Sequence, residues 1–268
     1  MLCNQPRSDK QSRLDTRSLF PVEVHEWVSE VSQQSRDLAE HHIWRELQHK
    51  EGVVWHRQAD PSLQGLSRSI EASNFPVRPP ETPTFSHVQS TTAMKGALLN
   101  TVGNSPLVTN GVISAEQRVA LENEFREMYR LVCALTGKSD AAIDLRVERE
   151  KAYIENFHQD YGTALLMTLS GPGPQFIQPA NVPTGHDGFF FRQELPRPDD
   201  VYQVPPLSLL AMRGKPDDGS YEAGSPQGLW HSSPPKLWNN TPQWDLRVLL
   251  IVTSPHSEIL PPRPNIQG

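Results

Sequence analysis

The stretch Val248-Leu249-Leu250-Ile251-Val252 is an uninterrupted apolar run of five residues, and no apolar run of the chain is longer. It is much shorter than the roughly 20 apolar residues that span a membrane, and its β-branched residues favour a buried strand. Five more short apolar or alternating stretches precede it, bounded by Gly, Pro, Asp or Asn: residues 143–147, 164–169, 175–177, 188–191 and 207–212. Short strands without intervening helices predict an antiparallel sandwich or barrel, and we expect a jelly roll.

Proline is distributed unevenly along the chain. Of the 25 prolines in 268 residues, 17 follow residue 160. Because proline is excluded from helix interiors, the second half favours strands and turns over long helices. We therefore predict an α+β protein in three parts: a flexible tail at 1–20, a mainly helical N-terminal region at 21–140 and a jelly-roll core at 141–268 that binds a metal.

The expected N-terminal region contains two stretches with helical spacing. Residues 22–49 fit one or two amphipathic helices, and residues 115–135 fit a longer one. Ser114 and Gln117 form a capping box before the second stretch, and Gly137 suits its C-terminal end. Between these helices, residues 53–57 predict a short strand, and residues 73–92, with four prolines, predict a loop.

Charge and cysteine content exclude several classes of protein. The net charge of −6 argues against a basic surface for binding nucleic acid. Cys3 and Cys133 are the only cysteines and form no CxxC pair, which argues against a disulfide framework or a zinc knuckle. The polar N-terminal stretch does not resemble a secretory signal. We expect a cytoplasmic protein with neither nucleic acid nor membrane as a partner, and the oligomeric state stays open.

Three residues form a candidate metal site. His158 and Asp160 come directly before the expected strand at 164–169, and residues i and i+2 of an extended segment point to the same side. His231 lies 71 residues beyond Asp160, in the sequence Gly228-Leu229-Trp230-His231-Ser232-Ser233-Pro234. Two imidazoles and one carboxylate bind one face of an octahedral iron. The alternative is that the three residues are solvated or hydrogen-bonded groups in turns.

A set of motifs gives this site a context. Phe157-His158-Gln159-Asp160, the Ser-Gly-Pro-Gly turn at 170–173, Trp230-His231-Ser232-Ser233-Pro234 and Arg247-Val248-Leu249-Leu250 follow one another in this order. The set resembles a little-characterised family of microbial and fungal proteins with FHxD, GPG, HxSP and RLLL motifs. That family is similar in its order of elements to the Fe(II)/2-oxoglutarate-dependent oxygenases, whose core is a double-stranded β-helix. The resemblance covers roughly residues 143–253.

The resemblance implies roles for four residues. His158, Asp160 and His231 would be the Fe(II) ligands, and Arg247 would bind the distal carboxylate of 2-oxoglutarate. A guanidinium suits this carboxylate because it donates two parallel hydrogen bonds. Arg247 follows His231 by 16 residues, a longer gap than is common in those oxygenases. A strand arginine held in an ion pair, for example with Asp245, is the alternative.

Three further residues are candidates for binding a substrate. Arg146 alternates with apolar neighbours in the expected strand at 143–147, so it either points into the barrel or faces water. Tyr161 and Trp230 flank the expected ligands and either line the pocket or pack in the core.

The function expected from this sequence is that of a mononuclear non-haem iron oxygenase. It would use Fe(II), 2-oxoglutarate and O2 to oxidise a small polar molecule, such as an amino acid or a biosynthetic intermediate. One alternative is a cupin-like metal-dependent dioxygenase that does not use 2-oxoglutarate. The other is a non-catalytic jelly-roll binding protein whose metal is structural or absent.

Overall fold

The structure is a computed structural model that describes residues 28–32, 36–57, 60–73, 84–148, 157–177, 201–215, 228–234, 237–238, 241–242, 246–256 and 259. The expected tail at 1–20, the expected strand at 188–191 and Asp245 lie outside these residues. The described helices are α1 (Arg36–Leu47), α2 (Pro61–Ala72), α3 (Thr91–Leu98), the π-helical turn η1 (Leu99–Gly103), α4 (Pro106–Thr109) and α5 (Ala115–Thr136).

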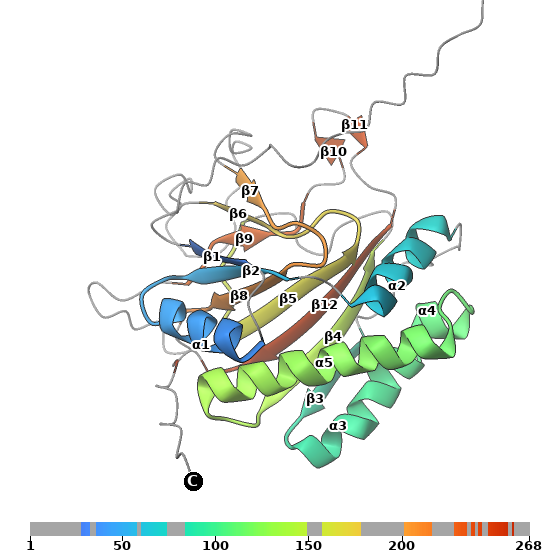
Figure 1. Cartoon of the computed structure of the whole chain (residues 1–268), viewed down its shortest axis with the longest axis horizontal. Helices are drawn as coiled ribbons and strands as arrows, with labels where there is room; N and C mark the ends of the chain where they lie inside the picture. Colours follow the sequence, from blue (N-terminus) through green and yellow to red (C-terminus); the bar gives the residue numbers. More distant parts are fainter. Residues whose placement is uncertain are drawn as a thin grey trace, which may run out of the picture.

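The described strands form two sheets and a short hairpin (Figure 1). The main sheet has the order β1-β2-β8-β5-β12-β4-β3, with bounds β1 Val28–Ser32, β2 Gly52–His56, β8 Leu209–Arg213, β5 Thr163–Ser170, β12 Arg247–Ser254, β4 Ala141–Glu148 and β3 Thr84–Val88. The small sheet has the order β7 (Val201–Gln203), β6 (Gln175–Ile177) and β9 (His231–Ser232), and the hairpin joins β10 (Leu237–Trp238) to β11 (Thr241–Pro242). In the main sheet all described pairings are antiparallel except β1 with β2, so the protein combines helices with a largely antiparallel sheet.

The two faces of the main sheet bury different neighbours because side chains alternate along each strand. On β12, Val248 and Leu250 belong to the apolar core shared with the helices. Leu249 and Ile251 belong to a second apolar core, which also contains Phe176 and Leu229 from the region of the small sheet. The main sheet is therefore covered on both faces, by helices on one side and by the small sheet on the other (Figure 1).

Helix α5 crosses the helix-covered face of the main sheet over β5, β12 and β4 (Figure 1). The Ser114 hydroxyl accepts a hydrogen bond from the Gln117 amide at 3.1 Å, and the Gln117 side chain accepts one from the Ser114 amide at 2.9 Å. Gly137 ends the helix with φ = +66° in the left-handed region. The predicted capping box and C-terminal glycine are confirmed.

Most of the expected strands agree with the structure, and two expectations in the N-terminal half were wrong. The strands predicted at 53–57, 143–147, 164–169, 175–177, 207–212 and 248–252 correspond to β2, β4, β5, β6, β8 and β12. The stretch at 22–49 contains strand β1 before helix α1, because residues 28–32 pair with β2. The stretch at 73–92, expected to be a loop, contains β3 and the start of α3, because Thr84–Val88 pairs with β4.

Strands from both halves of the chain share the main sheet. β2 and β3 come from the region expected to be mainly helical, and they pair with β8 and β4 from the region after residue 140. The change in amino-acid composition near residue 140 therefore does not mark a boundary between two sheets. Helices α2, α3 and α4 were not predicted individually.

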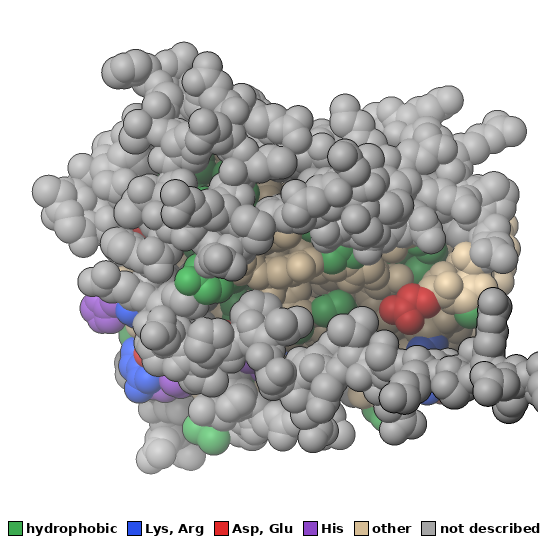
Figure 2. Space-filling model, turned by 90° about the horizontal axis from the view of Figure 1, so that it is seen from above, with side chains coloured by type: hydrophobic (Ala, Val, Ile, Leu, Met, Phe, Trp, Pro, Cys, Tyr) green, Lys and Arg blue, Asp and Glu red, His purple; other side chains and the backbone are tan. Residues whose placement is uncertain are grey.

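The charged side chains are unevenly placed on the face seen from above in Figure 2. In the described residues, the middle of this face shows hydrophobic side chains and uncharged atoms, and the charged and histidine side chains lie toward its two sides.

Within the described segments, no helix combines the length and apolar character needed to cross a membrane.

Truncation of Phe125 tests the packing of α5 on the sheet. The Phe125 side chain is fully buried in the core shared with the helices, so Phe125→Ala is expected to lower the free energy of unfolding by about 3 to 5 kcal/mol. Urea unfolding followed by circular dichroism measures the change. Val119→Ala, at a position that is 54% exposed, is the matched control and should cost less than about 0.5 kcal/mol. Equal losses in both variants would contradict this packing.

Candidate metal centre

A pair of backbone hydrogen bonds brings His158 and His231 together. The His158 amide donates to the His231 carbonyl at 2.9 Å, and the His231 amide donates to the His158 carbonyl at 2.9 Å. The two residues form an antiparallel bridge, although 73 residues separate them in the sequence. His231 belongs to β9, whose pairing with β6 holds it in the small sheet. The bridge places both imidazoles on one side, with ring centroids 4.4 Å apart.

Asp160 lies against both imidazoles. Its Oδ2 is 3.3 Å from His231 Nε2, and its Oδ1 is 3.5 Å from His158 Nε2. One ligand atom from each residue lies within 4.8 Å of the others. Ligand atoms bound about 2.1 Å from one ion at right angles lie about 3 Å apart, so this spacing fits a single divalent cation. The three residues named from the sequence therefore converge.

The turn that carries Asp160 is held by glycines and backbone hydrogen bonds. The Lys215 amide donates to the Asp160 carbonyl at 2.8 Å, and the Gly214 amide donates to the Gly162 carbonyl. A Cβ at Gly214 would collide with the carbonyls of Asp160 and Gly162, so only glycine permits this approach. Gly162 has φ = +74°, which also favours glycine. The position of Asp160 is thus fixed by a second segment of the chain.

The histidines are oriented to offer Nε2 to the cluster. His231 is 3% exposed, and its Nδ1 lies 3.0 Å from the Leu229 carbonyl. Donation from Nδ1 to this carbonyl directs Nε2 toward Asp160, and a bound metal would take the place of a proton on Nε2, as is typical of histidine ligands. The Asp160 side chain is 40% exposed, so the cluster has one open side and one buried side.

The charge of Asp160 is stabilised by its neighbours. Desolvation by partial burial raises the pKa of Asp160, but the hydrogen bond and charge of His231, followed by the charges of His158 and Arg146, lower this pKa to about 2. The carboxylate is therefore ionised at neutral pH, as a metal ligand must be. Two imidazoles and one ionised carboxylate form a donor set that suits a first-row transition metal.

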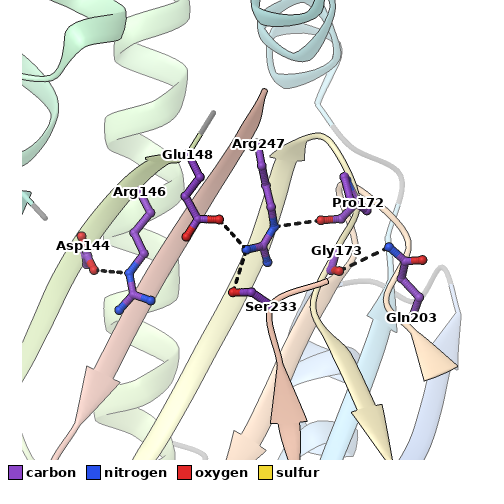
Figure 3. A network of polar contacts seen from close by, with 8 residues as sticks. All are labelled: Asp144, Arg146, Glu148, Pro172, Gly173, Gln203, Ser233 and Arg247. Carbon is purple, nitrogen blue, oxygen red and sulfur yellow. Dashed lines mark hydrogen bonds and ion pairs between the residues drawn. The ribbon is translucent and has the colours of Figure 1, made fainter. Parts of the chain in front are cut away.

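Arg247 is the largest fully buried side chain among the described residues and points to the same side of the sheet as Leu249 and Ile251. Its Nη1 donates to Glu148 Oε2 at 2.8 Å and to Ser233 Oγ at 3.0 Å, and its Nε donates to the Pro172 carbonyl at 2.9 Å (Figure 3). The guanidinium of Arg247 is therefore held inside the protein.

The partner of Arg247 is Glu148, a residue that the sequence did not single out. The two residues lie opposite each other in the register of β12 and β4. Glu148 alternates with Asp144 and Arg146 along β4, and this polar alternation was the available signal. Burial lowers the pKa of Arg247, while Glu148 opposes that effect, and an arginine remains charged in such a site. Asp245, the partner considered from the sequence, lies outside the described residues.

The three candidate substrate residues lie in different environments. Arg146 lies on the face of β4 that is turned toward the small sheet, which we call the inner face of the main sheet. Its Nε donates to Asp144 Oδ2 at 2.7 Å (Figure 3). Its charge is the last of the effects that lower the pKa of Asp160. Tyr161 is 44% exposed, and the Lys215 Nζ lies 4.3 Å from the centre of its ring. Trp230 is half-buried, and its carbonyl accepts a hydrogen bond from the Ile177 amide at 3.1 Å.

Comparison with protein families gives one match, which covers residues 32–251 and is described as protein of unknown function DUF1826. The chain belongs to this family. The match covers most of the main sheet and all of the His158, Asp160 and His231 cluster of this DUF1826 protein. No curated protein matches the sequence.

Among solved structures, the DUF1826 chain is similar to several at low identity. The dioxygenase for auxin oxidation 1 from Arabidopsis thaliana, in a complex with 2-oxoglutarate, is 11% identical over 88% of this chain and 96% of that one, with a TM-score of 0.45. A putative oxygenase from Shewanella oneidensis is 14% identical over 87% and 92%, with a TM-score of 0.39. HygX from Streptomyces hygroscopicus, with nickel and 2-oxoglutarate bound, is 12% identical over 82% and 87%, with a TM-score of 0.36.

Removal of one imidazole is expected to change the titration of Asp160 in the metal-free protein. A pKa of about 2 is below the ordinary 3.8, so Asp160 contributes stability above pH 3.8 that is lost as the pH falls through about 2. In His231→Ala the pKa of Asp160 should rise toward 3.8, because the hydrogen bond and charge of His231 are the main effects that lower it. Carbon-13 NMR of the aspartate carboxyls measures this shift.

His56→Ala is the control for this titration. His56 lies on β2, where its Nε2 is 3.5 Å from Glu30, so its loss should leave Asp160 unchanged. An Asp160 pKa that stays the same in His231→Ala would contradict the contact between these two side chains.

Proposed function

We propose that this protein is a mononuclear non-haem Fe(II) oxygenase that depends on 2-oxoglutarate and oxidises a small polar molecule. The convergence of His158, Asp160 and His231 carries this proposal, because this donor set leaves the opposite face of an octahedral iron open. We assign the two facing sheets to a double-stranded β-helix, with the cluster in the region between them.

Each residue of the cluster has a distinct task in this proposal. His158 and His231 would bind the metal through Nε2, and Asp160 would bind it through one carboxylate oxygen. The backbone bridge between the histidines sets the angle between their rings, and the Leu229 carbonyl holds the tautomer of His231. The bound iron would supply the oxidation of substrate by O2, coupled to decarboxylation of 2-oxoglutarate. The chain supplies placement and excludes water.

Arg247 would anchor the distal carboxylate of 2-oxoglutarate. Among the described residues its Nη2 has no hydrogen-bond partner, although the side chain is fully buried. A buried donor without an acceptor costs free energy, so an acceptor from a ligand would fit there. Ser233, which accepts from Nη1, lies two residues after His231 and links the arginine to the strand of the metal ligand.

The substrate would lie on the open side of the cluster. We assign its contacts to Arg146, Tyr161 and Trp230, and we place the reaction in the cytoplasm. Arg146 lies opposite Leu249 of β12, and its guanidinium points to the same side of the sheet as that of Arg247, which supports its assignment to the substrate (Figure 3). The half-exposed Tyr161 ring follows Asp160 directly and would border the entrance.

A cupin-like dioxygenase without 2-oxoglutarate is the second candidate. The observation that favours it is the ion pair between Arg247 and Glu148, because a guanidinium already paired with a carboxylate has fewer donors for a co-substrate. In this case Arg247 would support the fold or hold the substrate. A non-catalytic binding protein would catalyse oxidation neither with 2-oxoglutarate nor without it.

Metal content and succinate release distinguish these candidates. The proposal expects about one Fe(II) per chain and release of succinate that requires both O2 and 2-oxoglutarate. His231→Ala is expected to abolish iron binding, since two protein ligands hold iron weakly, and His41→Ala, at an exposed position on α1, should retain it. Iron binding by the parent without succinate release would favour the cupin-like candidate. Retention of iron and activity by His231→Ala would refute the metal site.

Arg247→Lys tests the role of the arginine separately from the metal. A lysine ammonium lacks the planar fork, so the 2-oxoglutarate concentration for half-maximal succinate release should rise by about tenfold or more. Iron affinity should stay near that of the parent, because Arg247 is outside the cluster of possible metal ligands. The measurement is succinate formation against 2-oxoglutarate concentration at saturating iron. An unchanged curve would reassign Arg247 to its ion pair with Glu148.

A further inference from the structure

The inner face of β4 and β12 carries an unusual set of buried charges. Asp144 and Glu148 are 4% and 5% exposed, and Arg247 is fully buried. Arg146 lies between the two acids on β4 and opposite Leu249 of β12, and in Figure 3 its guanidinium points to the same side as that of Arg247. The set contains two cations, Arg146 and Arg247, and two anions, Asp144 and Glu148.

The hydrogen bonds of the Arg247 side chain are distributed unequally among its three nitrogen atoms. Nη1 donates to both Glu148 and Ser233, Nε donates to the Pro172 carbonyl, and Nη2 has no partner among the described residues. The hydroxyl of Thr168, which is 1% exposed, also lacks a partner there. Thr168 pairs with Leu249, the next inward residue of β12 after Arg247, so both unpartnered groups are on the same face of neighbouring strands. An arginine with a purely structural role would be expected to use its remaining donors.

We propose that Glu148 is a positioning residue that holds Arg247 in place and, through its own charge, weakens the binding of the co-substrate carboxylate. This inference rests on the proposed function. A carboxylate that meets Nη2 of Arg247 would place a second negative charge on the same guanidinium, which is already paired with the carboxylate of Glu148. Repulsion between two carboxylates is strong where water is excluded. Glu148 therefore sets how much the distal carboxylate contributes to affinity.

The charge of Glu148 can be removed while its shape is kept. Glu148→Gln retains an oxygen that can accept from Arg247 Nη1, and it removes the negative charge next to this guanidinium. Binding of 2-oxoglutarate should become about tenfold tighter. Binding of 2-oxopentanoate, which lacks the distal carboxylate, should stay unchanged. Isothermal titration calorimetry of the nickel(II)-loaded protein without oxygen measures both affinities, and a merely structural role would not change the ratio between the two.

Two control variants separate charge from packing. Glu148→Asp keeps the charge and should show no tightening. Glu124→Gln removes a different buried acid, paired with Arg57 on the helix side of the sheet, and should leave both affinities unchanged. Equal or weaker 2-oxoglutarate binding by folded Glu148→Gln would overturn the inference, as would equal tightening by Glu124→Gln.

The parent protein gives a second measurement that does not depend on the folding of a variant. If Glu148 opposes the distal carboxylate, 2-oxoglutarate should bind less than about tenfold more tightly than 2-oxopentanoate. An advantage of about a hundredfold or more would overturn the inference while leaving the proposed function intact. If neither the parent nor Glu148→Gln binds 2-oxoglutarate, the co-substrate assignment fails, and the role of Glu148 fails with it.

Discussion

The site depends on the two backbone hydrogen bonds that join His158 to His231. They connect the segment before β5 of the main sheet with β9 of the small sheet, so the separation of the imidazoles is set by main-chain geometry. Side chains held in this way need little further ordering when a metal binds. The turn at Asp160 then adds the carboxylate, and its own position depends on the close approach of Gly214.

The inner face of the main sheet has two parts with different polarity. Toward β8 and β2, Leu166, Leu210 and Val54 form an apolar core with the small sheet. Toward β4, the residues in the same alternation are Asp144, Arg146 and Glu148, and Arg247 faces them from β12. Because one half packs tightly and the other is built from charges, the first stabilises the two-sheet arrangement and the second offers groups that bind polar ligands.

The strands of the second half of the chain could be predicted from the sequence because each is a short apolar stretch between turn residues. Helix α5 was predictable because its capping residues agree with its apolar period. β1 and β3 were missed, since both are edge strands of the main sheet and their pairing is not visible in the local sequence. For the site, the spacing of His158 and Asp160 indicated one pair of groups, His231 was the candidate for a third, and the resemblance implied that all three are iron ligands.

The convergence of the three candidate metal ligands depends on tertiary structure, and no local pattern contains it. Glu148 could not be identified as the partner of Arg247 without the register of β4 and β12, since 99 residues separate them. Local patterns give the chemistry of the residues, and the strand register decides which of them meet.

The guanidinium of Arg247 connects its own strand to three other segments of the chain, with hydrogen-bond partners 99, 75 and 14 residues away. Contacts across such separations form only after the intervening loops have closed, and this closure costs entropy that local contacts do not. A chain in which β12 has not yet inserted between β4 and β5 would leave Glu148 without its arginine and the β9 segment without this tie. The binding site would then be among the last parts of the molecule to form, and a folding intermediate could contain the α5 core without any capacity to bind ligand.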